Sequence, residues 1–308
     1  MKGISMKAAA INSFGGPEVV ELLEVETPTA GPGQVRVRVK AAGIQTADCS
    51  VRGGWTPPGQ TLSFPQKIGN EFAGVVDQTG EGVEDFEVGS EVLGWALLSC
   101  HAEYLVVPTD QIVTKPAGMP WDVAGVFSAS GQTAHTALDK LKVGSGDTLL
   151  IHAAAGGVGT VAVQLALTYG ATVIGTASPR NHDYLRSLGA IPVAYGDGLV
   201  ERVRALAPEG VTAILDGAGG EALDASVELL ENRDRIGTLV GFERLEELGI
   251  VGVFTQRSLT RLRELSELYT QGKLHIEIAR TFPLAAAADA HREVETRHTR
   301  GKLVIVTD

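Results

Sequence analysis

The chain has 308 residues, and its 37 acidic residues outnumber its 26 basic ones, which gives a formal charge of −11. This negative balance repels phosphate backbones and anionic lipid, so neither nucleic acid nor a membrane is an expected partner. Hydrophobic residues make up 44% of the chain and charged residues 20%, a composition that excludes intrinsic disorder and supplies core material for about two domains.

The cysteine count and the N-terminal sequence indicate a cytoplasmic protein. Cys49 and Cys100 are too few for a disulfide framework or a four-cysteine zinc lobe. Residues 1–7 contain no apolar run of signal-peptide length. The weakly polar stretch 149–175 contains three closely spaced glycines and several polar side chains, so it favours a buried strand, turn and helix over a membrane span.

The first third of the chain, from Lys7 to about Pro120, predicts short strands separated by Gly and Pro. In the clearest of them, Gln34 to Lys40, valines alternate with charged residues, as in a half-buried strand. Further strands are expected at 19–25, 72–78, 91–95 and 102–107. Together they indicate a small β-barrel or sandwich.

After Trp121 the pattern changes to alternating strands and helices. Helical spacing runs from Val123 to Leu141, and the array that follows predicts parallel strands joined by helical crossovers. The expected strands lie near 147–152, 171–176, 191–194, 211–215 and 235–240, and the expected helices near 158–169, 181–188, 198–206, 220–231 and 258–271. A final helix over 286–298 and a strand over 302–306 are expected to return to the first domain.

A glycine-rich turn joins the first strand of this array to its first helix, and it predicts a dinucleotide site. Gly156 and Gly159 let the backbone approach a pyrophosphate and let the helix pack close to its strand, while the helix N-terminus supplies N–H groups. Ala154 replaces the first glycine of the G-x-G-x-x-G pattern, but the flanking strand and helix preserve its context. The candidate cofactor-binding residues of the turn are Ala154, Ala155, Gly156, Gly157, Val158 and Gly159.

The end of the second strand favours NADPH over NADH. An NAD site usually has Asp or Glu there to bind the ribose hydroxyls, whereas residues 171–180 contain no carboxylate and place Ser178 and Arg180 where a 2′-phosphate would lie. An ordinary solvated arginine is the alternative. Two later strand ends supply further cofactor-side candidates, because such sheets hold ligands at the carboxyl ends of their strands; these are Asp216, Gly217, Gly241 and Phe242.

Several motifs together resemble one family. They are Phe14-Gly15-Gly16-Pro17-Glu18-Val19, Ala42-Gly43-Ile44 with Asp48 and Arg52-Gly53-Gly54, the run from Ile68 to Val76, the A-A-A-G-G-V-G turn and His298-Thr299-Arg300-Gly301-Lys302. Over nearly its whole length the chain resembles the zinc-independent quinone oxidoreductases of the medium-chain dehydrogenase/reductase superfamily.

The resemblance implies an α/β fold with two domains and a homodimer. A GroES-like β-barrel domain would comprise residues 1–122 and 273–308, and a Rossmann domain with a doubly wound parallel sheet would comprise residues 123–272 and bind NADPH. Zinc-dependent members of the superfamily have Cys and His ligands where this chain has Gln45 and Asn70, so no metal is expected. Their proton-relay hydroxyl falls on Ala47.

Without a metal, the acceptor must be activated by conjugation and by hydrogen-bond donors that meet developing oxygen charge. Gln45 and Thr133 are the candidate catalytic donors, with a purely structural polar role as the alternative for each. The leading hypothesis is an NADPH-dependent reductase of quinones or enones. An enoyl-thioester reductase and a cofactor-binding protein with little turnover, such as a crystallin-like or regulatory protein, are the alternatives.

Overall fold

The computed structural model describes residues 5–307 and divides the chain into two compact units. Unit 1 comprises Met1–Ala129, Ser258–Ser266 and Ile278–Asp308, and unit 2 comprises Ser130–Arg257 and Glu267–Glu277. The expected domain boundaries, 1–122 with 273–308 and 123–272, stay a prediction, and their outermost positions, 1–4 and 308, lie outside the described residues.

Unit 1 is built on two sheets. A three-stranded sheet has the order β2-β1-β4, and a seven-stranded sheet has the order β15-β16-β3-β5-β6-β8, with β7 also paired to β3. The strands are β1 (Ser5–Ile11), β2 (Val20–Glu26), β3 (Gln34–Ile44), β4 (Gln66–Lys67), β5 (Glu71–Thr79), β6 (Glu91–Trp95), β7 (Tyr104–Pro108), β8 (Ile112–Thr114), β15 (Ile278–Pro283) and β16 (Lys302–Val306). Helices α1 (Thr46–Arg52), α2 (Trp121–Gly125) and α10 (Ala287–Glu295) accompany them, together with residues 259–266 of α9 (Leu259–Thr270).

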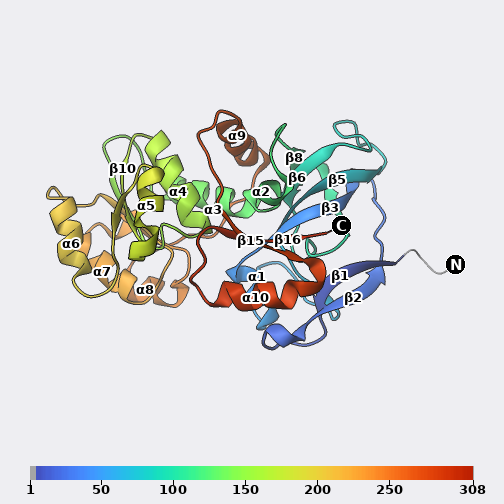
Figure 1. Cartoon of the computed structure of the whole chain (residues 1–308), viewed down its shortest axis with the longest axis horizontal. Coiled ribbons are helices and arrows are strands. Elements are labelled where there is room, and N and C mark those ends of the chain that lie inside the picture. The colour runs from blue at the N-terminus through green and yellow to red at the C-terminus, as the bar shows by residue number, and fades with distance from the viewer. Residues whose placement is uncertain (1–4, 308) are drawn as a thin grey trace. The chain divides into compact units, whose positions relative to one another are not determined.

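The valine alternation seen in the sequence forms the core of the larger sheet. Val35, Val37 and Val39 on β3 are fully buried and pack in one cluster with Phe72 and Leu105. The C-terminal part of the chain returns to this unit, as expected, because β16 pairs antiparallel with β3. Helices α1 and α10 contact each other and lie side by side in Figure 1.

Unit 2 contains one parallel sheet of six strands in the order β11-β10-β9-β12-β13-β14. Numbered from β9, this order is 3-2-1-4-5-6, that of a doubly wound dinucleotide-binding fold. The strands are β9 (Thr148–Ile151), β10 (Thr172–Thr176), β11 (Ile191–Val193), β12 (Ala213–Asp216), β13 (Ile236–Thr238) and β14 (Val251–Gly252). The helices of this unit are α3 (Phe127–Lys140), whose first three residues belong to unit 1, α4 (Gly157–Thr168), α5 (His182–Ser187), α6 (Leu199–Leu206), α7 (Glu221–Leu229), α8 (Leu245–Leu248) and the last turn of α9.

The expected strands and helices of the parallel array are confirmed to within two or three residues. One expectation is wrong: the helical pattern from Val123 to Leu141 forms two helices, because the backbone leaves the helical conformation at Val126. The break follows Gly125, which packs so close to β3 that a Cβ there would lie 2.6 Å from the Cβ of Ala41. No range was predicted from the sequence for strands β1, β4, β8, β14 and β15 or for helices α1 and α8.

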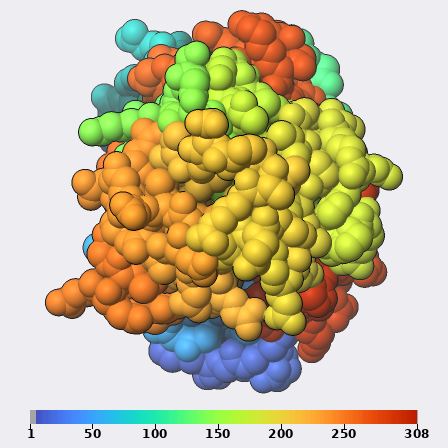
Figure 2. Space-filling model, turned by 90° about the vertical axis from the view of Figure 1, so that its left-hand side faces the viewer, coloured from blue at the N-terminus to red at the C-terminus, as the bar shows by residue number. Residues whose placement is uncertain are grey.

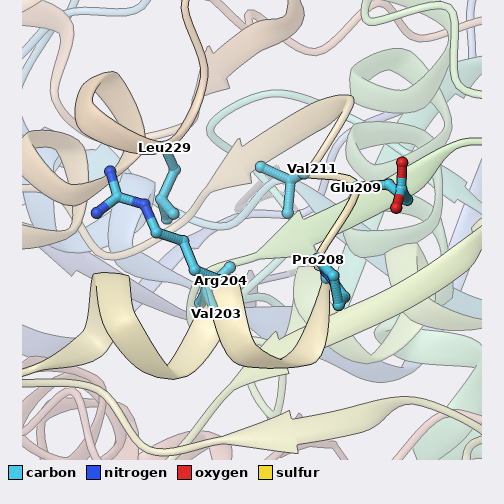
Figure 3. Close-up of a pocket in the computed structure, with 8 residues that line it drawn as sticks. Val203, Arg204, Pro208, Glu209, Val211 and Leu229 are labelled. Atoms are coloured by element: carbon cyan, nitrogen blue, oxygen red, sulfur yellow. The ribbon is translucent and has the colours of Figure 1, made fainter.

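A shallow hollow of about 360 Å³ lies beside the C-terminal end of α6, on the face of unit 2 formed by α6 and α7, toward which Figure 2 looks. Arg204 and Leu229 lie on one side of it and Glu209 on the other (Figure 3). The chain segment here leads into the amino end of β12, so the hollow is at the opposite edge of the sheet from the carboxyl ends where such folds hold ligands.

Among residues 5–307, no helix combines the length and the apolar character needed to cross a bilayer.

Candidate active site

The glycine-rich turn connects the carboxyl end of β9 to the first turn of α4, which begins at Gly157 after an N-cap at Gly156. A Cβ on Gly159 would lie 2.4 Å from the carbonyl oxygen of Ala153, so this position requires glycine for the helix to approach its strand. Ala153 has a φ of +58°, which bends the chain sharply out of the strand. The N–H groups of the first helical turn have no partner within the helix, and they form the donor set that a pyrophosphate needs.

The alanine in place of the first glycine is accommodated by a glycine on the neighbouring strand. Ala154 is fully buried, and a Cβ on Gly175 of β10 would lie 2.7 Å from the Ala154 methyl carbon. The Ala154 N–H donates to the carbonyl of Thr176 on the same strand at 3.0 Å. The turn and β10 therefore stay closely packed, because the methyl group of Ala154 fills the space left by the missing side chain of Gly175.

A buried polar network lies behind the turn. His152 Nε2 lies 3.1 Å from Ser226 Oγ, and Ser226 donates to the carbonyl of Ala222. His152 Nδ1 lies 3.4 Å from the hydroxyl of Thr176, which also accepts the N–H of Ala153 at 3.2 Å. Burial lowers the pKa of His152 to about 4, so the ring is neutral and its two nitrogens act as one donor and one acceptor.

At the end of β10 a short 3₁₀ turn, Pro179–Asn181, contains Arg180. Ser178 precedes this turn, its Oγ accepts from Asn181 Nδ2 at 3.3 Å, and Arg180 is exposed. The residues from Thr176 to Arg180 include no carboxylate. The donor set at this strand end fits a 2′-phosphate and lacks the group that would hold an unphosphorylated ribose.

The carboxylate of Asp216, at the end of β12, is fully buried and shapes the next two turns. It accepts the N–H groups of Ala218 and Gly219, each at 2.9 Å, and the hydroxyl of Thr238 at 2.7 Å. The Thr238 hydroxyl in turn accepts the N–H of Gly241 at 3.1 Å. Asp216 thus holds the backbone at two strand ends.

The two glycine candidates at these strand ends differ in their surroundings. A Cβ on Gly217 would lie 3.3 Å from the carbonyl oxygen of His152, which places Gly217 next to the glycine-rich turn. Gly241 packs against Leu223, whose Cδ1 would be 2.4 Å from a Cβ there. Phe242 follows Gly241 and is 36% exposed.

Thr133, the candidate donor on α3, is paired with a residue that the sequence did not single out. Its Oγ1 lies 2.7 Å from Oγ1 of Thr255, in the loop after β14. The preceding residue, Phe254, stacks on Phe242 with ring centroids 4.7 Å apart and planes inclined by 14°. The carboxyl edge of the unit 2 sheet therefore carries a hydroxyl pair and an aromatic pair.

In unit 1, Gln45 is the N-cap of α1. Its side chain accepts the N–H of Asp48, and the carboxylate of Asp48 accepts the N–H of Gln45 at 2.9 Å, which forms a capping box. The amide nitrogen of Gln45 also lies 3.3 Å from a carboxylate oxygen of Glu71. One of its two amide N–H donors is thus engaged within unit 1, and the residue is half-buried.

Glu71 and Lys302 form a buried ion pair beside Gln45. The side chains are 0% and 6% exposed, and the Lys302 ammonium lies 2.9 Å from Glu71 Oε1. The other carboxylate oxygen accepts the N–H of Ala129 at 2.6 Å. A Cβ on Gly43 would lie 2.2 Å from Glu71 Oε1, so the glycine makes room for the carboxylate.

Asn70, at the second position that corresponds to a zinc ligand, is buried and donates to Asp48 Oδ1 at 2.6 Å. Among the described residues, no group of three His, Cys, Asp or Glu side chains is placed to hold a metal ion. Cys100 and His101 are both fully buried and hydrogen-bonded to backbone carbonyls, those of Ala96 and Gly43.

Cys49 belongs to a buried cluster near the C-terminal end of α1, away from Gln45. Cys49 Sγ and Arg52 Nη1 each lie 3.4 Å from Nδ1 of His291 on α10. Burial raises the pKa of the Cys49 thiol to about 12, so it is not a nucleophile at neutral pH. Burial and the nearby charge of Arg52 lower the pKa of His291 to about 3.

Comparisons with known proteins agree with this architecture. A family model described as "Alcohol dehydrogenase GroES-like domain" matches residues 31–117, and one described as "Zinc-binding dehydrogenase" matches residues 188–305. A 2-haloacrylate reductase from a Burkholderia species is 33% identical over 97% of this chain and 98% of its own length. A quinone oxidoreductase from Pseudomonas aeruginosa is 30% identical over 96% of this chain and 97% of its own.

Solved structures of related proteins have the same fold over nearly the whole chain. The quinone oxidoreductase from Coxiella burnetii has a TM-score of 0.89 and 33% identity, with 99% of this chain and 100% of that chain covered. A mycobacterial protein complexed with NADPH has a TM-score of 0.85 and 29% identity over 98% of this chain and 100% of its own. The fold is that of the medium-chain dehydrogenases and reductases, and the chain belongs to the zinc-independent quinone oxidoreductase family within that superfamily.

Proposed function

We propose that this oxidoreductase transfers hydride from NADPH to quinones or other conjugated carbonyl compounds without a metal ion. The proposal rests on the donor groups at the carboxyl edge of the unit 2 sheet. There the Gly159 turn supplies backbone donors at the end of β9, and the end of β10 presents Ser178 and Arg180 with no carboxylate. This set suits a dinucleotide with a 2′-phosphate.

The residues proposed to hold the cofactor are those of the glycine-rich turn, Ala154 to Gly159, with Ser178 and Arg180 at the 2′-phosphate. Gly217, Gly241 and Phe242 would lie along the second half of the dinucleotide, with Asp216 holding their turns through its buried hydrogen bonds. When bound, NADPH supplies the hydride from its nicotinamide ring. The NADPH-bound mycobacterial relative supports this choice of cofactor.

The absence of zinc is proposed from the chemistry at Gln45 and Asn70. Amides are poor zinc ligands compared with thiolate and imidazole, and both side chains are engaged in hydrogen bonds with carboxylates. The acceptor must then carry its own activation, which quinones and enones have through conjugation. A free N–H of Gln45 and the Thr133 hydroxyl are the donors proposed to meet the oxygen charge that grows during the reaction, and solvent supplies the proton.

Reduction of an activated alkene is the second candidate reaction, and two relatives favour it. One is the 2-haloacrylate reductase. The other is the CurK enoyl reductase, whose structure matches with a TM-score of 0.88 and 26% identity over 98% of this chain and 99% of its own. A homodimer and a cytoplasmic location are further parts of the proposal, and the two free thiols, both buried, suit a reducing compartment.

The experiment is steady-state oxidation of NADPH by the purified protein with three acceptor sets: quinones, enones and a crotonyl thioester. We expect turnover with quinones and enones that exceeds turnover with the thioester. A preference for the thioester would assign the protein to enoyl-thioester reduction, and no turnover with any set would leave a cofactor-binding protein. Light scattering of the same sample measures the oligomeric state, for which we expect two chains.

The role of Gln45 is tested by Gln45→Ala. If its amide stabilises oxygen charge that appears only during hydride transfer, kcat should fall about 10²-fold while the NADPH dissociation constant changes little. If Gln45 only positions the nicotinamide, affinity and turnover should fall together. Because the variant also removes the cap of α1, its thermal unfolding must be measured beside wild type, with a loss of about 1 kcal/mol expected. A wild-type kcat would remove Gln45 from the catalytic residues.

A further inference from the structure

The stacked pair of Phe242 and Phe254 leaves aromatic surface open to solvent. Phe254 is 61% exposed although one face of its ring lies against Phe242, so much of the rest of the side chain is open to solvent. A single exposed apolar side chain is ordinary on a protein surface. Three further observations distinguish this one: the way its loop is held, the edge of the sheet on which it lies, and the hydroxyl pair beside it.

The loop that carries Phe254 is fixed on both sides of the ring. Before it, the N–H of Val253 donates to the carbonyl of Thr238 at 2.9 Å. After it, Thr255 pairs with Thr133 at 2.7 Å, and the N–H of Gln256 donates to Oγ1 of Thr136 at 3.1 Å. A ring held this way loses little conformational entropy when a ligand packs on it, which is a property of preorganised binding surfaces.

The position of the pair fits a ligand at the reacting end of the cofactor. Phe242 follows β13 and Phe254 follows β14, the fifth and sixth strands of the 3-2-1-4-5-6 order. These strands belong to the second mononucleotide-binding half of such a sheet, which under the proposed function takes the nicotinamide half of NADPH. Phe254 is also the residue next to Thr255, the hydrogen-bond partner of the candidate donor Thr133.

We propose that Phe254 is a specificity-determining residue, on whose open face the ring of a planar aromatic quinone stacks. The inference rests on the proposed function and names its preferred acceptor class. With NADPH bound, hydride would pass between facing rings, so an acceptor ring with one face toward the nicotinamide would keep the other for Phe254. Two electrons and one hydrogen reach the quinone, NADPH becomes NADP⁺, and the hydroquinone anion takes a proton from water.

This arrangement favours ring acceptors over open-chain ones. Aromatic stacking contributes affinity beyond the burial of apolar area, and only a planar ring can gain it fully. An acyclic enone or an enoyl thioester has no ring to place on Phe254. Fused-ring quinones should therefore bind more tightly than small enones of similar polarity.

The test uses Phe254→Leu, which removes the ring but keeps an apolar side chain, and Phe254→Tyr, which keeps the ring. Leu206→Ala is the matched control, because Leu206 is an apolar side chain, 40% exposed, on α6 toward the amino edge of the same sheet. Equilibrium dialysis measures the dissociation constant of menadione for the protein loaded with NADP⁺, where no turnover occurs. The dissociation constant of NADPH and kcat/KM for menadione and for an acyclic enone are measured in parallel.

We expect Phe254→Leu to weaken menadione binding about 3- to 10-fold, and Phe254→Tyr to stay within about twofold of wild type. The loss of menadione affinity in Phe254→Leu should exceed any change in NADPH affinity or in kcat/KM for the acyclic enone, and all values for Leu206→Ala should stay at those of wild type. Unchanged menadione binding in Phe254→Leu would overturn the proposal. So would a parallel loss of NADPH affinity, which would assign the ring to the nicotinamide, or an equal loss with the enone or in Leu206→Ala.

These outcomes are separable from failure of the proposed function. A wild-type protein that oxidises no NADPH with any acceptor would refute the reductase assignment, whereas the dialysis measurement would still report whether menadione depends on Phe254. Because Phe254 is exposed, its variants should fold, and unchanged thermal unfolding confirms this.

Discussion

The zinc-ligand positions of unit 1 and the carboxyl edge of the unit 2 sheet differ in how their side chains are arranged. In unit 1, the side chains around the zinc-ligand positions satisfy one another: Asn70 donates to Asp48, and Gln45 and Lys302 both lie against Glu71. In unit 2, the carboxyl edge of the sheet offers backbone N–H groups and exposed side chains such as Arg180 and Phe254. Changes to the buried groups Glu71, Asn70 and Lys302 should therefore appear mainly as lost stability, and changes at the unit 2 edge mainly as lost binding; Gln45, whose second amide N–H is proposed to meet the acceptor, is the exception in unit 1.

The largest effect is expected at the buried ion pair. Lys302→Met leaves the Glu71 carboxylate buried without its cation and should lower the free energy of unfolding by about 3–5 kcal/mol. Glu71→Gln in the same chain should recover much of that loss, because it removes the stranded charge. Urea denaturation measures both variants.

A matched control for the ion pair is Arg186→Met, since Arg186 pairs with Asp183 at the surface, where the side chains are 59% and 97% exposed. Its stability should stay close to wild type because exposed pairs contribute little. Equal losses for Lys302→Met and Arg186→Met would contradict the view that unit 1 depends on its buried charges.

The next effect is expected at Gly159, where the change should appear as lost binding. In Gly159→Ala the new Cβ meets the backbone of Ala153 and Ala154, so the helix N-terminus must move away from the turn. NADPH affinity should fall about 10²-fold, since several backbone donors lose their positions together. Isothermal titration calorimetry reports the dissociation constant.

Gly144→Ala serves as the control, because a Cβ at that position would have nothing within 4 Å and the backbone is not left-handed. It should bind NADPH as wild type does. If Gly159→Ala also binds normally, the close approach of α4 to its strand has no part in cofactor binding.

Arg180→Ala should weaken NADPH binding about 10- to 150-fold, because a guanidinium–phosphate bond contributes roughly 1.5–3 kcal/mol. NADH binding and the free energy of unfolding should change little, since the arginine is exposed. Titration of both cofactors into both proteins measures this. Equal affinity of the parent protein for NADPH and NADH would remove the basis for the assignment.

The smallest change in a measured quantity is expected in the slope of stability against pH, about 1 kcal/mol per pH unit for one histidine. Burial lowers the pKa of His101 and His152 to about 4 and that of His291 to about 3, well below the value of about 6.5 in an unfolded chain. The unfolded state therefore binds more protons below pH 6.5. Stability is fully present above that pH and declines as pH falls toward 4, by up to about 1.4 kcal/mol per pH unit for each histidine.

For unit 2 this is tested by measuring the free energy of unfolding of His152→Gln between pH 7.5 and 4.5. Its slope against pH should be smaller than that of wild type by about 1 kcal/mol per pH unit. His298→Gln is the control, because His298 is exposed. The slope, rather than the absolute stability, is compared, since the glutamine alters the hydrogen bonds behind the turn. An unchanged slope in His152→Gln would show that the ring is not held neutral.

The sequence predicted those features that depend on neighbouring residues alone. The parallel array and its glycine-rich turn followed from alternating strand and helix periods, and Gly159 from the close packing that only glycine permits. It missed Thr238, Thr255 and the ion-pair role of Lys302, because their partners are 22, 122 and 231 residues away in the chain. Only tertiary structure brings such partners together.

The break between α2 and α3 shows a second limit. Helical spacing continues through Gly125, but the close packing of that residue against Ala41 of β3 cannot be read from periodicity. His152 illustrates the same point, since a histidine at the end of an apolar strand gives no sign of the hydroxyls that satisfy both its nitrogens. In each case the local sequence is compatible with more than one tertiary environment.

The central claim is that this chain is an NADPH-dependent reductase that works without a metal. The most direct test is oxidation of NADPH and NADH, with menadione as acceptor, by protein dialysed against a chelator and measured for zinc. We expect less than stoichiometric zinc, activity equal to that of undialysed protein, and kcat/KM at least about 10-fold higher with NADPH. One tightly bound zinc per chain whose removal abolishes activity, or equal kcat/KM with the two cofactors, would contradict it.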